Sequence, residues 1–142
     1  METCLRYVRA LLLSTMLCFS ARAQSLLPQV DGQLVRFNAS IDFKRGGMSG
    51  ICALRLDGEE LKGSLFNEFG ISALDFTCQC KKRKVRIVNA ISMLNKWYIK
   101  RVLRQDLMHV VDALGSGDTT YVNTRRHITY QFSRMPQNDT EE

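Results

Sequence analysis

The sequence predicts an α+β fold in which a curved antiparallel β-meander of about six or seven strands packs against one amphipathic α-helix. Apolar and polar residues alternate over residues 34–43, and turn residues recur at about ten-residue spacing as far as residue 88. Between Leu94 and Leu114 the apolar period lengthens to three or four residues. Successive strands followed by one helix are typical of an α+β architecture.

The first strand is predicted over residues 34–43. Its alternate positions are apolar and are expected to face the core: Val35, Phe37, Ala39, Ile41 and Phe43. Lys44 to Gly47 then supplies a turn, because its two glycines are free to take positive φ.

Four further strands are predicted over residues 48–56, 59–66, 71–80 and 85–88. Asp57-Gly58 is a strong hairpin-turn signal between the first two of them. The strand at 48–56 is apolar on both faces, which predicts that one face meets the helix and the other meets a partner, a second layer or a lipid.

The helix is predicted over residues 93–114. Ser92 or Asn95 is expected to cap its start, and Gly115 is expected to form a left-handed C-cap. One or two more strands are predicted between Tyr121 and Phe132.

The N-terminus predicts export. Arg6 and Arg9 precede an apolar run of about ten residues and then Ala21-Arg22-Ala23, which is the order of parts in a cleavable signal peptide. Because about 20 apolar residues are needed to span a bilayer, no transmembrane segment is expected after cleavage. The expected location is the periplasm or the outer-membrane periphery. The predicted segments are a signal peptide at 1–23, a linker at 24–33, one domain at 34–134 and a disordered acidic tail at 135–142.

Signal cleavage leaves 17 basic and 13 acidic residues, so the mature net charge is +4. One basic cluster, Lys81, Lys82, Arg83 and Lys84, is a candidate surface for phosphates or anionic lipid headgroups, and a solvated hairpin tip is the alternative. Export argues against nucleic acid as a partner.

Three cysteines stay in the mature chain: Cys52, Cys78 and Cys80. Cys78 and Cys80 alternate along one strand and are not expected to bridge each other readily. A bridge from Cys52 to one of them and three unpaired, buried thiols both remain open. The C-x-C spacing with one distant cysteine is not typical of a metal site.

No motif for catalysis, a metal or a cofactor occurs, so a non-enzymatic protein without cofactors is expected. Asp106 and His109 lie three apart on the predicted helix, where an acid–base pair is conceivable. Such helix-face pairs are ordinarily structural, and a hydrolase with a spatially assembled site is the least favoured hypothesis.

Four segments carry a family resemblance: Met48-Ser49-Gly50-Ile51, residues 65–70, Leu74-Asp75-Phe76 and residues 93–96. In this order and spacing, residues 33–112 resemble small envelope proteins of Bacteroidetes that are related to the lipoprotein-localisation (Lol) factors and are often described as lipoproteins or uncharacterised. The resemblance implies an open half-barrel whose concave apolar side receives lipid acyl chains. The chain departs from the family in being shorter and in lacking a lipobox before Cys18.

These observations predict a non-enzymatic exported envelope protein that binds an apolar ligand or a lipid acyl chain in a cleft between sheet and helix. The candidate lining residues are Phe37, Leu54, Phe66, Phe76, Trp97 and Leu103. The alternative is a structural or interaction module of the cell envelope that docks a partner protein or an anionic membrane surface.

Overall fold

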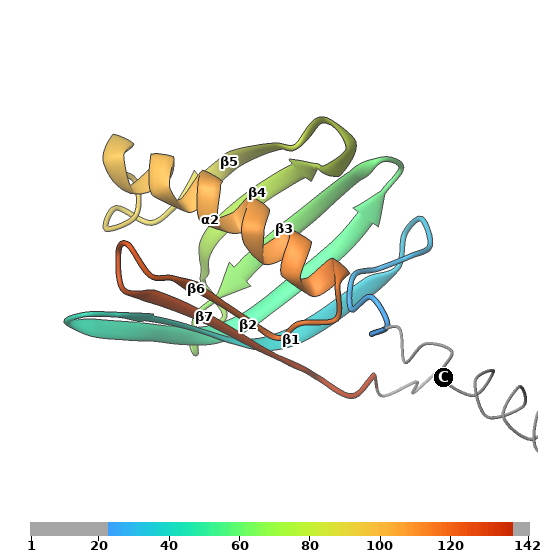
Figure 1. Ribbon diagram of the computed structural model, residues 1–142, viewed down its shortest axis with the longest axis horizontal. Coiled ribbons are helices and arrows are strands. Elements are labelled where there is room, and N and C mark those ends of the chain that lie inside the picture. The colour runs from blue at the N-terminus through green and yellow to red at the C-terminus, as the bar shows by residue number, and fades with distance from the viewer. Residues whose placement is uncertain (1–22, 138–142) are drawn as a thin grey trace, which may run out of the picture.

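A computed structural model describes residues 23–137 and shows one seven-stranded antiparallel sheet curled around a long helix (Figure 1). The predicted α+β half-barrel is therefore confirmed. The predicted signal peptide covers residues 1–23, of which all but Ala23 lie outside the described residues. Residues 138–142 of the predicted tail also lie outside them.

The first five strands lie side by side in chain order, and the last two strands are added beside the first strand. The elements are β1 (Leu34–Phe43), β2 (Gly46–Asp57), β3 (Glu60–Phe66), β4 (Ser72–Gln79), the 3₁₀ turn η2 (Cys80–Lys82), β5 (Lys84–Ala90), α2 (Trp97–Gly115), β6 (Thr120–Asn123) and β7 (Ile128–Arg134). The strand order is β5-β4-β3-β2-β1-β7-β6. The helix thus carries the chain from one edge of the sheet to the other, and β7 pairs with β1.

β1 is the strand on which the rest of the sheet is built, because it pairs with both β2 and β7. Its burial alternates as the sequence predicts, with Phe37 fully buried and Arg36 and Asn38 exposed on the opposite face. The Phe37 ring meets the ring of Phe132 edge to face at a centroid distance of 6.1 Å. The face that carries Phe37 therefore belongs to the core.

Close packing between β3 and β4 depends on a glycine. A Cβ atom added at Gly63 would lie 2.3 Å from a ring carbon of Phe76, the residue that pairs with Gly63 across the two strands. No side chain fits there without moving the ring. The glycine lets Phe76 lie flat against the inner face of the sheet.

Both predicted helix ends are wrong. The helix begins at Trp97, and its N-cap, Lys96, makes no capping hydrogen bond through its side chain. Residues 91–95 form turns instead, in which the buried Leu94 donates its N–H to the Ile91 carbonyl at 2.8 Å. Anchoring Leu94 in the core holds this segment in a turn, so neither Ser92 nor Asn95 is the cap.

At the other end the left-handed glycine comes two residues later than predicted. Gly115 is the last helical residue, and Ser116 caps the helix in a right-handed conformation. Gly117 takes a φ of 84° and donates its N–H to the Leu114 carbonyl at 3.1 Å. The reversal therefore falls at Gly117.

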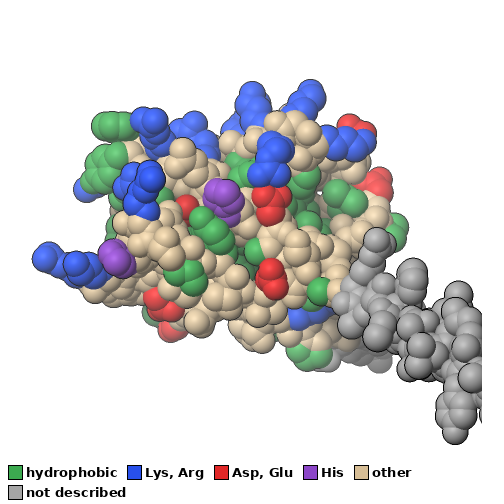
Figure 2. Space-filling model, viewed as in Figure 1, with side chains coloured by type: hydrophobic (Ala, Val, Ile, Leu, Met, Phe, Trp, Pro, Cys, Tyr) green, Lys and Arg blue, Asp and Glu red, His purple; other side chains and the backbone are tan. Residues whose placement is uncertain are grey.

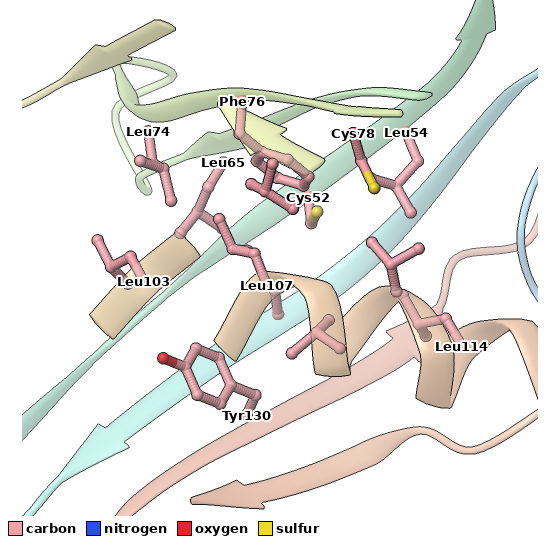
Figure 3. Packing of buried hydrophobic residues seen from close by; sticks show 14 of the residues in the cluster. Cys52, Leu54, Leu65, Leu74, Phe76, Cys78, Leu103, Leu107, Leu114 and Tyr130 are labelled. Carbon is pink, nitrogen blue, oxygen red and sulfur yellow. The ribbon is translucent and has the colours of Figure 1, made fainter. Parts of the chain in front are cut away.

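The core lies between the concave face of the sheet and α2 (Figure 3). Leu103, Leu107 and Leu114 come from the helix and lie across from sheet residues such as Leu54 and Phe76. These side chains are almost fully buried, and the removal of their apolar surface from water stabilises the fold.

The segment predicted as a linker, residues 24–33, packs against the fold. Leu26 donates its N–H to the Leu114 carbonyl at 2.9 Å, and Leu26 and Leu27 pack on the core cluster. Asp31 accepts a hydrogen bond of 2.7 Å from the N–H of Gly58 in the β2–β3 turn. The segment therefore covers one end of the core.

Candidate functional site

The six candidate lining residues do not share one cleft. Phe37, Leu54, Phe76 and Leu103 lie in the core between sheet and helix, as predicted for the concave side. Phe66 lines a groove on the outer face of the sheet. Trp97 is 74% exposed at the start of α2. The structure thus brings four of the six residues together.

The space between sheet and helix is almost filled by side chains. A cavity of about 20 Å³ remains, lined by core residues of the sheet, by Leu107, Val110, Val111 and Leu114 of α2 and by Tyr130. Pockets for drug-sized ligands measure about 300–1,000 Å³. In this conformation the cleft has no room for an acyl chain.

The outer face of the sheet carries the second apolar surface predicted for the strand at 48–56. A broad, open groove of about 1,140 Å³ runs over β1, β2 and β7, with Ile51, Ala53 and Phe66 among its lining residues. Ile51 and Ala53 point away from the core, since the residues that alternate with them, Cys52 and Leu54, are buried. The two-sided apolarity of β2 thus corresponds to a core face and an open groove.

Two of the four residues in the predicted basic cluster at residues 81–84 form ion pairs. Lys81 pairs with Glu59, and Arg83 forms two hydrogen bonds, of 2.8 and 3.2 Å, to the Asp112 carboxylate on α2. Exposed Lys82 belongs to η2, whereas Lys84 begins β5 and lines a hollow beside the helix. Lys81 and Arg83 thus have carboxylate partners in this conformation, whereas Lys82 and Lys84 form no salt bridge with the described residues.

A different set of cations gathers along the exposed side of α2. Three adjoining hollows of about 690, 430 and 300 Å³ lie between β5, the helix and the β6–β7 turn. Eight Lys and Arg side chains of the described residues line these hollows. Arg83 is paired with Asp112, and we call the other seven the basic face: Lys84, Arg86, Lys100, Arg101, Arg104, Arg125 and Arg126. Among the described residues, the one carboxylate that lines these hollows is the buried Asp106, and none of these cations forms a salt bridge.

Exposed apolar side chains stand beside the basic face where α2 begins. Trp97, Tyr98 and Met93 are 74%, 49% and 58% exposed, and the two aromatic rings meet edge to face at 5.9 Å. Figure 2 shows basic side chains around a hydrophobic protrusion at this end of the molecule. Trp97, a candidate lining residue of the cleft, therefore lies outside it, because burial on α2 starts only at Leu103.

A buried polar network joins the helix to the β6–β7 turn. Asp106, which is 2% exposed, accepts hydrogen bonds from the Tyr130 hydroxyl at 2.7 Å and from the Asn123 amide at 2.8 Å. The Asn123 Oδ1 atom in turn accepts the backbone N–H of Arg126 at 3.1 Å. Burial, together with the hydrogen bond to Asp106 and its charge, raises the pKa of Tyr130, so this hydroxyl stays a donor. The network fixes the turn that presents Arg125 and Arg126.

The conceivable acid–base pair on the helix is not formed. Asp106 bonds to Tyr130 and Asn123, whereas the His109 ring stacks on Tyr121 at a centroid distance of 5.3 Å. Within residues 23–137 no cluster of three or more His, Cys, Asp or Glu side chains has the arrangement of a metal site. The geometry therefore gives no support to a hydrolytic centre at His109.

The three cysteines are free thiols. Cys52 and Cys78 are buried, and burial raises the pKa of each thiol to about 12. Cys80 is exposed, with its sulfur 3.5 Å from that of Cys78, so the expectation of three buried thiols is wrong for Cys80. The chain leaves the strand at η2, which turns Cys80 outward.

No family model, no curated protein and no solved structure matches this chain. Among the described residues, no helix combines the length and apolar character needed to cross a bilayer.

Proposed function

We propose that this protein is a non-enzymatic interaction module of the cell envelope that docks onto an anionic membrane surface through the basic face and the apolar side chains beside it. The observation that carries the proposal is the joint exposure of Trp97 and Tyr98 next to Arg101, Arg125 and Arg126, with which they line one hollow. Tryptophan and tyrosine favour the membrane–water interface, where an apolar ring and a polar edge are both satisfied.

The charge distribution supports the same proposal. Each Lys or Arg near an anionic bilayer contributes about 1 kcal/mol of attraction. The cations of the basic face form no salt bridges with the acidic residues of the described chain, so no internal partner has to be displaced on docking. The basic face therefore supplies seven cations beside an apolar anchor, the two kinds of contact on which reversible binding to an anionic membrane surface depends.

Vesicle co-sedimentation tests this proposal. Replacing Arg101 and Arg104 together by glutamine is expected to weaken binding to anionic vesicles by roughly 30-fold, because two contributions of about 1 kcal/mol are lost. Binding by the unaltered protein should also fall as salt is raised.

The matched control is the double replacement of Arg36 and Arg55 by glutamine, which removes the same charge. Both arginines are exposed on β1 and β2, on the face of the sheet opposite the core. This control is expected to bind like the unaltered protein. Equal weakening by the two double variants would show that net charge alone governs binding and would contradict the assignment of the basic face.

A second candidate function is the binding of an apolar ligand between sheet and helix, which the enclosed apolar cavity and the family resemblance favour. Because that cavity measures about 20 Å³, α2 would have to move away from the sheet to admit an acyl chain. Native mass spectrometry of residues 24–142 purified from the periplasm distinguishes the two functions. Membrane docking alone predicts the mass of the bare chain, whereas the carrier function predicts added mass that solvent extraction identifies as lipid.

A further inference from the structure

We propose that the largest hollow of the basic face is a binding site for a phosphate monoester group. The hollow has a volume of about 690 Å³ and lies between β5, α2 and the β6–β7 turn. Its cations come from all three elements: Lys84 from β5, Arg104 from α2, and Arg125 and Arg126 from the turn. The inference rests on the proposed docking function and names the chemical group that the basic face recognises.

These four cations line one hollow although like charges repel one another. Arg83 also lines the hollow, but its guanidinium is held by the Asp112 carboxylate. Lys84, Arg104, Arg125 and Arg126 have no such partner among the described residues. Four unpaired cations around one hollow raise the energy of the empty site through like-charge repulsion, and a bound anion would relieve it.

The β6–β7 turn, which carries Arg125 and Arg126, is held in place by hydrogen bonds that link it to α2. Asp106 accepts the Asn123 amide, and Asn123 accepts the Arg126 backbone N–H. His127 closes the turn in the left-handed conformation, with a φ of 55°. Because a buried carboxylate on the helix fixes the turn through Asn123, the backbone that carries Arg125 and Arg126 is held at the same hollow as Arg104 before any ligand arrives.

The chemistry of these side chains favours a phosphate over a carboxylate. Arginine presents a planar fork of N–H donors that matches two oxygens of a phosphate, and three arginines line this hollow without an acidic partner among the described residues. A phosphate monoester has three terminal oxygens and carries close to two negative charges at neutral pH. It therefore neutralises more of the cluster than a carboxylate does.

Two sources supply such a group, namely a lipid headgroup with a terminal phosphate and a soluble phosphorylated compound. The first test needs no membrane. Inorganic phosphate is titrated into the full mature protein at constant ionic strength, with chloride as the reference anion, and binding is followed by amide NMR shifts. We expect saturable shifts at the β6–β7 turn and around Arg104, and the double variant R104Q/R126Q is expected to weaken binding by about tenfold or more.

Two further variants separate the site from general charge effects. R36Q/R55Q removes two charges from the other face of the sheet and is expected to bind phosphate unchanged. Asn123→Ala keeps every cation but releases the turn, and weaker phosphate binding by this folded variant would show that Asn123 acts as a positioning residue. Shifts spread over all basic residues, or equal weakening in R36Q/R55Q, would overturn the site.

A second arm identifies the source and separates this inference from the docking proposal. Vesicles containing phosphatidic acid, a phosphate monoester, are compared with vesicles of matched surface charge containing phosphatidylglycerol, a diester. Stronger binding to phosphatidic acid supports a lipid headgroup. Saturable binding of inorganic phosphate without vesicle binding supports a soluble source and contradicts membrane docking. Equal vesicle binding with no phosphate site supports docking and overturns the inference.

Discussion

Replacing Phe37 by alanine is expected to lower the free energy of unfolding by about 3–5 kcal/mol. The side chain is fully buried on β1 and packs edge to face on Phe132 of the neighbouring strand β7. Its removal opens a cavity in a closely packed core, where the space between sheet and helix holds a cavity of only about 20 Å³. Urea denaturation followed by circular dichroism measures the change.

Phe69→Ala is the matched control for this prediction, because Phe69 is 84% exposed and makes no core contact. It is expected to change stability by less than about 0.5 kcal/mol. If Phe37 instead lined a ligand space that opens in solution, its truncation would cost little stability and would change lipid occupancy. That pattern would contradict the closed core and favour the carrier function.

Replacing Asp106 by alanine is expected to lower the free energy of unfolding by on the order of 3 kcal/mol. The substitution leaves the buried Tyr130 hydroxyl without its acceptor and removes the bond that holds Asn123. The loss should therefore exceed that of an ordinary surface carboxylate. The β6–β7 turn should also become more mobile, which amide hydrogen exchange at Arg126 reports.

Asp112→Ala provides the comparison on the same helix. Asp112 is exposed and bonds to the exposed Arg83, and such surface pairs contribute about 0–1 kcal/mol. Equal losses for the two variants would show that the buried network does not stabilise the turn. Asp106→Asn should lie between them, because an amide oxygen can still accept from Tyr130 while its NH₂ group opposes that of Asn123.

Much of the fold could be predicted from local patterns. The alternation over residues 34–43 gave β1 its observed bounds, because a strand with one buried face shows the period of two directly. The turn predicted at Asp57-Gly58 was displaced by one residue, since Asp57 still pairs with Glu60 and the turn residues are Gly58 and Glu59. The change of period into the helix could also be predicted from the local pattern. The helix ends could not be predicted from local patterns. Leu94 is buried in a turn outside the helix, and its position there depends on tertiary packing.

The candidate site was harder to predict because its parts are far apart in the sequence. Lys84, Arg104 and Arg126 come from three elements, and only the crossover through α2 brings them to one hollow. Trp97 matched the helical period of the core residues, so spacing alone could not show that the first turn of α2 is exposed. One signal was present: Arg125 and Arg126 form a pair with no acidic neighbour in sequence, within the region between Tyr121 and Phe132 where one or two strands are predicted.

Trp97 allows the central proposal to be tested directly, because it is the only tryptophan in the sequence and is 74% exposed. Its fluorescence emission is measured as vesicles are added to the mature protein. Docking through the start of α2 predicts a shift to shorter wavelength with anionic vesicles, reversed by high salt and absent with neutral vesicles, since the indole enters the interface. Emission that stays unchanged while the protein co-sediments with anionic vesicles would place the contact elsewhere and contradict the account.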